Sequence, residues 1–182
     1  MPTFIALLRA VNLGGHKPLA MSSLRDFFAD LSFTDARTLL QTGNVVFRGE
    51  ARTVSNLEHL LEREAKARLG LDTVFFIRSA DDWKALQRQN PFPDEALRDP
   101  SHLVVMFLKE APDAKSLAKL RTAIRGPEIV DVAERQAYIV YPTGIGRSRL
   151  THALIETMLG TRGTGRNWNT VLKLAALAAS CE

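Results

Sequence analysis

The organisation of the chain follows from its opening run, Thr3-Phe4-Ile5-Ala6-Leu7-Leu8-Arg9-Ala10-Val11. This run is apolar, too short for a typical helix and followed by a glycine turn, so we interpret residues 3–11 as a buried strand. The loop that follows is Asn12-Leu13-Gly14-Gly15-His16-Lys17-Pro18. Apolar residues then recur at helical spacing up to Leu31, with Ser22 as the expected N-cap. The chain therefore opens as strand, loop and helix.

A hairpin and a second helix follow. The hairpin spans residues 36–47, and its turn is Gln41-Thr42-Gly43-Asn44, in which Gly43 can adopt a positive φ at no steric cost. The helix is expected over residues 54–65, because its apolar residues recur on one face. Glu58 and Glu62 fall on the opposite face, which we expect to be exposed.

A further strand is expected at residues 73–77, and Ser79 with Asp82 forms a capping box for a short helix after it.

The second half of the chain repeats the order of elements seen in the first half. The second half is expected to have strands at 102–108, 129–132 and 137–141 and helices at 113–124 and 150–159. Strand–helix–strand–strand–helix is the order of the split βαβ, ferredoxin-like unit. We therefore predict an α+β fold of two ferredoxin-like halves packed together, with an extra C-terminal helix over residues 168–179.

A proline-rich break separates the two halves. It contains Asn90-Pro91-Phe92-Pro93 and Asp99-Pro100, and proline can neither continue a helix nor donate to a sheet ladder. We predict an N-terminal half over residues 1–95 and a C-terminal half, including the last helix, over residues 101–182.

Composition excludes several classes of protein. The 182 residues are 46% hydrophobic with a net charge of +4, which argues against disorder. No apolar run is long enough to span a bilayer, and the N-terminus lacks the basic head of a secretory signal, so no membrane partner is expected. The single cysteine, Cys181, cannot form an internal disulfide. We expect a cytoplasmic protein.

The sequence offers no motif for a metal, a cofactor or a catalytic nucleophile. Its four histidines lack metal-ligand spacing, so no metal site is predicted. The stretch Gly144-Ile145-Gly146-Arg147-Ser148-Arg149 fails the dinucleotide fingerprint, because Arg149 stands at the third glycine position. There is no Gly-x-Ser-x-Gly elbow. We therefore assign no cofactor and no catalytic residue.

Topology predicts a polar rim at one edge of the first sheet. In the split βαβ unit the first and second strands run parallel, so the loop after the first and the turn after the second lie at the same edge. Their amides, imidazole, ammonium and glycine N–H groups suit a small anionic or phosphate-bearing ligand. The candidate ligand-binding residues at this rim are Arg9, Asn12, Gly14, Gly15, His16, Lys17, Gln41, Thr42, Gly43 and Asn44.

A second candidate anion site precedes the last helix, where Arg166 and the capping residue Asn167 stand before a helix N-terminus. The structural alternative is that Asn167 only caps this helix.

Two other functions stay open. The first is an enzyme that uses the rim pocket, with His16 as a general base. The second is nucleic-acid binding through the C-terminal part, since the whole net charge of +4 lies beyond residue 100. A standard RNA-recognition platform is not expected, because the central strands lack paired aromatic residues. The sequence does not predict the oligomeric state.

Four segments together resemble domain of unknown function family 1697. They are Ala6-Leu7-Leu8-Arg9-Ala10-Val11-Asn12-Leu13-Gly14-Gly15, Gln41-Thr42-Gly43-Asn44-Val45-Val46-Phe47, Asn90-Pro91-Phe92 and Arg166-Asn167-Trp168-Asn169-Thr170-Val171. The resemblance covers nearly the whole chain. The chain departs from it at Ala10, where the family often has Gly, and at Thr42, where it often has Ser. The resemblance implies a soluble bacterial α+β protein and no particular activity.

Overall fold

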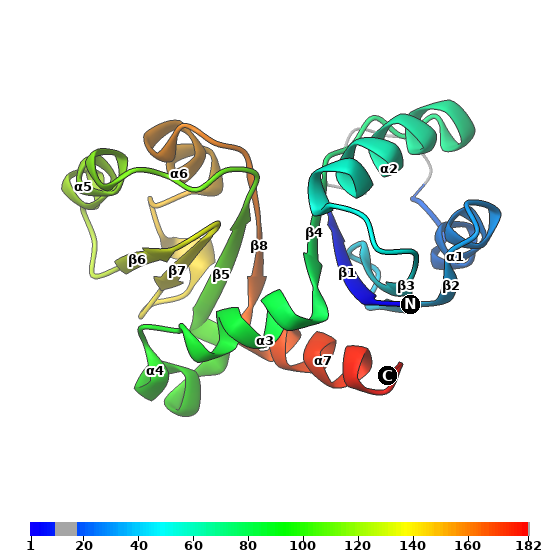
Figure 1. The fold of residues 1–182 in the computed structure, drawn as a ribbon. Helices are drawn as coiled ribbons and strands as arrows, with labels where there is room; N and C mark the ends of the chain where they lie inside the picture. The colour runs from blue at the N-terminus through cyan, green and yellow to red at the C-terminus, as the bar shows by residue number, and fades with distance from the viewer. Residues whose placement is uncertain (10–17, 182) are drawn as a thin grey trace. The chain divides into compact units, whose positions relative to one another are not determined.

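The structure, a computed structural model, describes residues 1–9 and 18–181 (Figure 1). The chain divides into two compact units: unit 1 is Met1–Lys84 with Lys173–Glu182, and unit 2 is Ala85–Leu172. The division falls inside two helices, α3 (Ala80–Arg88) and α7 (Trp168–Ala179). The predicted boundary between residues 95 and 101 stays a prediction.

Unit 1 is built on a four-stranded antiparallel sheet with the strand order β2-β3-β1-β4. Its elements, in chain order, are β1 (Thr3–Leu8), α1 (Met21–Asp30), β2 (Thr34–Leu39), β3 (Asn44–Arg48), α2 (Val54–Leu69) and β4 (Phe75–Ser79). Both helices pack on one face of the sheet, as in the split βαβ unit.

Unit 2 repeats this topology with the strand order β6-β7-β5-β8. The two short helices α4 (Pro93–Arg98) and η1 (Pro100–His102) come before its sheet, and the single turn η2 (Ile145–Arg147) precedes α6. The sheet and its helices are β5 (Leu103–Leu108), α5 (Ala114–Ala123), β6 (Ile129–Ala133), β7 (Gln136–Val140), α6 (His152–Leu159) and β8 (Gly163–Asn167). The predicted α+β fold, with two ferredoxin-like halves and a C-terminal helix, is confirmed.

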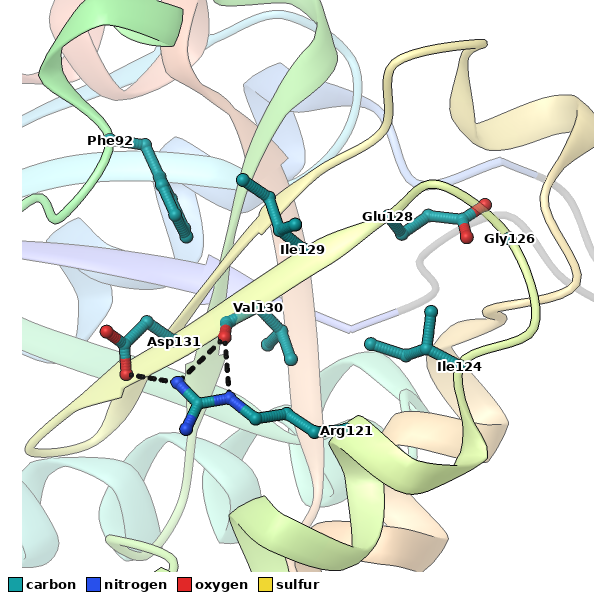
Figure 2. Close-up of a pocket in the computed structure, with 8 residues that line it drawn as sticks. All are labelled: Phe92, Arg121, Ile124, Gly126, Glu128, Ile129, Val130 and Asp131. Carbon is teal, nitrogen blue, oxygen red and sulfur yellow. Dashed lines mark hydrogen bonds and ion pairs between the residues drawn. The ribbon is translucent and has the colours of Figure 1, made fainter.

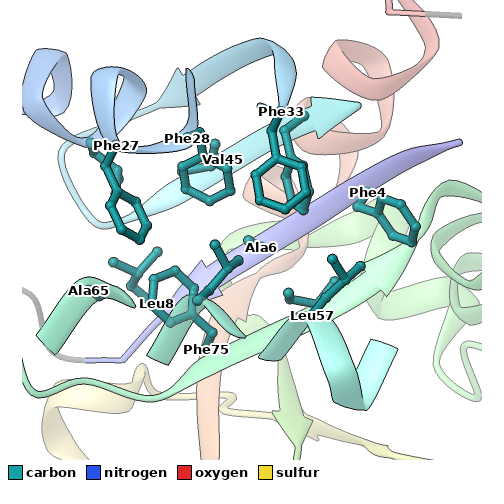
Figure 3. Packing of buried hydrophobic residues seen from close by; sticks show 14 residues of the cluster. Phe4, Ala6, Leu8, Phe27, Phe28, Phe33, Val45, Leu57, Ala65 and Phe75 are labelled. Atoms are coloured by element: carbon teal, nitrogen blue, oxygen red, sulfur yellow. The ribbon is translucent and has the colours of Figure 1, made fainter. Parts of the chain in front are cut away.

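The core of unit 1 gathers around Phe47 on β3. Its ring lies 4.8 Å from that of Phe28, 4.9 Å from that of Phe33 and 5.6 Å from that of Phe4, measured between ring centroids. Figure 3 shows side chains from α1, α2 and the sheet meeting in this cluster. Tilted and edge-to-face aromatic pairs add to the stabilisation that burial of their area already provides.

Both faces of β1 are buried. Alternate residues Phe4, Ala6 and Leu8 belong to the core beneath the helices, yet Ile5 and Leu7, which point to the other face, are fully buried too. A strand covered on both faces has no reason to alternate between apolar and polar residues. Burial on both faces therefore explains why residues 4–8 are apolar without interruption.

Helix α2 covers the outer edge of β4. This strand ends its sheet, so the N–H groups on its outer side have no neighbouring strand. Glu58 and Glu62, one helical turn apart, accept hydrogen bonds from them: Ile77 N donates to Glu58 Oε1 at 2.9 Å and Phe75 N to Glu62 Oε1 at 3.0 Å. The prediction that both carboxylates are exposed is wrong, because Glu58 is buried and Glu62 half-buried.

Helix α6 covers β8 in the corresponding way. Gly163 N donates to Glu156 Oε1 at 3.0 Å. One turn earlier, the ring of His152 lies over Gly165, where a Cβ atom would stand 2.6 Å from Cε1. The pair His152 and Glu156 thus occupies the place of Glu58 and Glu62. Any larger residue at this position would have to displace the imidazole, because the ring approaches the backbone so closely.

The edge strands at the other ends of the two sheets, β2 and β6, also differ from a regular open edge. The pairing of β2 with β3 shifts register between Thr34 and Arg37, and Asp35 has a φ of 52°. On β6, Arg121 donates to Val130 O, and Asp131 Oδ1 accepts from Val132 N at 2.9 Å. The bonds on β6 occupy groups that a further strand would need, and the irregularity of β2 interrupts the regular backbone that a further strand would pair with.

Three local predictions need correction. Strand β1 ends at Leu8 and not at residue 11. Ser22 lies inside α1, whose N-cap is Ala20. The polar stretch Gly163–Asn167, for which the sequence analysis predicts no strand, is the strand β8. The capping box is confirmed, since Ser79 N donates to Asp82 Oδ2 and Asp82 N to Ser79 Oγ.

We expect Glu58→Ala to lower the free energy of unfolding by about 1–3 kcal/mol, because Ile77 N loses its carboxylate acceptor in a buried place. Glu58→Gln keeps an oxygen acceptor and should cost less. Urea unfolding of the full chain measures both variants. An equal loss in the two would show that the charge, and not the hydrogen bond, is what matters there.

Helix α7 provides a second test, because Asn167 Oδ1 accepts from Thr170 N at 3.0 Å and so caps it. Asn167→Ala should lower the free energy of unfolding by about 1 kcal/mol. The matched control is Asn169→Ala, since Asn169 is exposed within the same helix and should change stability by less than about 0.5 kcal/mol. Equal effects of the two substitutions would contradict the capping role.

Candidate functional site

The end of β1 and the tip of the β2–β3 hairpin are in direct contact. Leu8 N donates to Gly43 O at 2.8 Å, and Leu7 pairs with Asn44 in the sheet. The chain segment that leaves β1 therefore starts beside the hairpin, as the parallel course of β1 and β2 predicts.

Arg9 follows directly, and both polar groups of its backbone are bonded to the segment that precedes β4. Its N–H donates to Val74 O at 3.0 Å, and its carbonyl accepts from Thr73 Oγ1 at 2.6 Å. The residue is half-buried. Its position at the end of a central strand is thus fixed by one bond to the backbone of Val74 and one from the side chain of Thr73.

The hairpin turn divides into exposed and buried residues. Gln41 and Thr42 are exposed, whereas Gly43 is buried and has a φ of 75°. Asn44 is fully buried, and its Nδ2 donates to Leu39 O and to Thr42 Oγ1, each at 2.9 Å. Asn44 thus holds the shape of the turn, and Gln41 and Thr42 are the turn residues that face solvent.

Five of the predicted rim residues lie outside the described residues: Asn12, Gly14, Gly15, His16 and Lys17. That these five residues bind a ligand at the rim stays a prediction.

The second candidate anion site belongs to unit 2, where both of its residues have structural bonds. Asn167 caps α7, as described above. One guanidinium nitrogen of Arg166, Nη1, donates to Thr164 Oγ1 and to Gly165 O, each at 2.9 Å. Burial lowers the pKa of this guanidinium to about 10, so it keeps its positive charge at neutral pH.

Arg166 has a counterpart in unit 1. Arg78 on β4 pairs with Ile5 of β1, as Arg166 on β8 pairs with Val105 of β5. Each of the two arginines also donates to the carbonyl of the residue before it. The internal repeat therefore includes an arginine at the same register position on the last strand of each sheet, which the sequence analysis did not predict.

Unit 2 also contains a cavity of about 530 Å³ beside the edge of β6 (Figure 2). It mixes apolar and charged side chains, and its lining residues are Phe92, Arg121, Ile124, Gly126, Glu128, Ile129, Val130 and Asp131. The guanidinium of Arg121 donates to Val130 O at 3.2 Å and to Asp131 Oδ1 at 3.1 Å. Sequence reasoning missed this site, since no motif marks these residues.

Glu128 is the buried charged residue of this cavity. Only 8% of its surface is exposed, and one of its carboxylate oxygens accepts a short hydrogen bond from Ser148 Oγ. Ser148 Oγ in turn accepts from Leu150 N at 3.0 Å. Burial, and then the negative charge of Glu128, raise the pKa of the Tyr141 hydroxyl above its usual range.

A smaller cavity of about 240 Å³ lies near η1. His102 Nδ1 and Asp99 Oδ2 are 2.7 Å apart at its wall, and Asp99 also accepts from Ser101 Oγ at 2.7 Å. Such a carboxylate orients an imidazole, but no nucleophile is placed against it by the contacts of the described residues.

Within residues 1–9 and 18–181, no group of three or more His, Cys, Asp or Glu side chains is arranged to hold a metal ion. None of the helices in the same residues has the length and apolarity required to cross a bilayer.

Comparison with known proteins supports the fold and identifies the family. A solved structure, that of the conserved bacterial protein SP0830 from Streptococcus pneumoniae, superposes with a TM-score of 0.77. The two chains are 18% identical, and the match covers 97% of this chain and 98% of the other, so the likeness concerns the fold. No curated protein matches the chain. The family model described as protein of unknown function (DUF1697) matches residues 1–138, and the chain therefore belongs to that family.

Proposed function

We propose that the protein binds a small anionic or phosphate-bearing ligand at the rim where the first strand–helix loop leaves β1 beside the hairpin turn. The observation that supports this most is the 2.8 Å bond from Leu8 N to Gly43 O, because it brings the start of the loop to the turn. Backbone N–H groups at glycines, with a cation close by, are a common way to bind an anion.

Some rim residues would contact the ligand, and others would hold the rim in shape. Arg9 and Lys17 would supply positive charge, and Gln41 and Thr42 would donate from the exposed part of the turn. Gly14 and Gly15 would let the backbone approach the ligand. Asn44 would support the turn from below, since its amide is used inside the hairpin.

The two other functions stay predictions. An enzyme would use the same rim, with His16 as its base. Nucleic-acid binding would depend on the basic residues of the C-terminal part, but Arg166 already has acceptors inside unit 2. The proposal includes a cytoplasmic setting, which fits a chain whose single cysteine can form no internal disulfide.

Thermal unfolding of the full chain with ATP, pyrophosphate or inorganic phosphate tests the proposal. A ligand that binds only the folded state and is present at 100 times its dissociation constant should add about 2.7 kcal/mol of stability. Lys17→Ala and Gln41→Ala should each reduce this gain without changing the stability of the free protein by more than about 0.5 kcal/mol.

The control for charge is Lys119→Ala, which removes an exposed lysine from α5 in unit 2. It should leave the gain intact. Three outcomes would contradict the proposal: no stabilisation by any of the phosphates, an undiminished gain in both rim variants, or an equal reduction in the Lys119 control.

A further inference from the structure

We propose that the cavity of Figure 2 is a second binding site, which takes a small organic ammonium ion with an apolar body and holds its ammonium group against Glu128. Its volume of about 530 Å³ lies within the range usual for small-ligand pockets. The site belongs to unit 2 and does not depend on the rim of unit 1.

The burial of Glu128 and its few bonds point to a cation as the ligand of this cavity. Its side chain is almost fully buried, and within the described residues its one hydrogen bond is the one from Ser148. In that part of the chain it forms no ion pair with a lysine, arginine or histidine. A buried carboxylate is costly unless a positive charge or several donors compensate it. An ammonium group would provide the missing compensation.

The neighbouring Arg121 does not compensate the negative charge of Glu128. Arg121 lines the same cavity, but its Nε and Nη2 donate to Val130 O and Nη2 to Asp131. Its charge is thus matched by Asp131, which leaves Glu128 as the unmatched charge of the lining. The cavity should therefore favour cations, in contrast to the rim of unit 1.

The rest of the lining suits an apolar body. Ile129 is 44% exposed, and it stands between Phe92 and Glu128 in the view of Figure 2. Ile124 adds a further apolar wall near Gly126. A ligand with its ammonium at Glu128 would cover Ile129 and extend toward the ring of Phe92.

Glu128 also has a structural role, because it anchors Ser148 in the connection from β7 to α6. Glu128→Gln separates the two roles: the amide oxygen can still accept from Ser148 Oγ, but the negative charge is gone. Gly126→Ala gives a second, steric variant, since a Cβ atom at Gly126 would collide with the Glu128 carboxylate and must displace it.

The probe is 2-phenylethylamine, with 3-phenylpropionate as the probe of similar shape and opposite charge. A nitrogen-15 NMR titration of the full chain should show saturable shifts around Gly126–Val130 with the amine and none with the carboxylate. Glu128→Gln should weaken amine binding about tenfold or more, because a charge-assisted hydrogen bond is lost, with the melting temperature nearly unchanged. Gly126→Ala should weaken it as well.

The control Glu110→Gln removes one negative charge from an exposed position outside the cavity and should leave amine binding unchanged. The proposal is overturned by the absence of saturable shifts at up to about 10 mM amine, where a fragment of millimolar affinity would be bound. It is also overturned if the carboxylate probe binds as well as the amine, or if Glu128→Gln binds the amine as tightly as the unmodified protein.

Discussion

The hydrogen bonding of β1 to β3 on one side and to β4 on the other is the constraint on which unit 1 depends. A central strand in an antiparallel sheet needs a partner at each edge, so its neighbours must be supplied by segments far along the chain. The hairpin provides one and β4 the other. The same pairings hold Leu8 against Gly43 and Arg9 against Val74, so the core of unit 1 and the geometry of its rim have one origin.

The two units resemble each other in side-chain positions as well as in the order of their elements. In each unit the second helix faces the last strand with two residues one turn apart, and in each the last strand carries an arginine at the same register position. The chemistry differs between the units, however. Two carboxylates accept from β4, whereas one carboxylate and one imidazole cover β8, and the imidazole lies close over a glycine. The repeat is therefore one of position and contact, and side-chain identity is free to change.

The sequence predicted those elements whose signal is local and failed where the signal is tertiary. The apolar run of β1 and the helical spacing of α1 and α2 were sufficient for the topology. The strand β8 was missed because Gly163-Thr164-Gly165-Arg166-Asn167 has low β-propensity and becomes a strand through its pairing with β5. Glu58 was placed outside because helical periodicity shows which face is apolar, and not which carboxylate another strand will need. For the rim, topology predicted that the chain leaves β1 beside the hairpin turn, and Leu8 N contacts Gly43 O there; the rim itself stays a prediction. The cavity at Glu128 could not be predicted, since its lining combines a helix, a loop, a strand edge and the distant Phe92.

The protection of the sheet edges bears on how the protein behaves when it is concentrated or partly unfolded. An open strand edge invites pairing with another molecule and so promotes aggregation. Here Glu58 and Glu62 occupy the outer N–H groups of β4, and Arg121 and Asp131 occupy groups on β6. Loosening α2 would therefore do more than weaken its unit: it would uncover a strand rich in phenylalanine and isoleucine that can recruit other copies. We therefore expect the carboxylates of this helix to limit aggregation of the partly unfolded protein as well as to stabilise its fold.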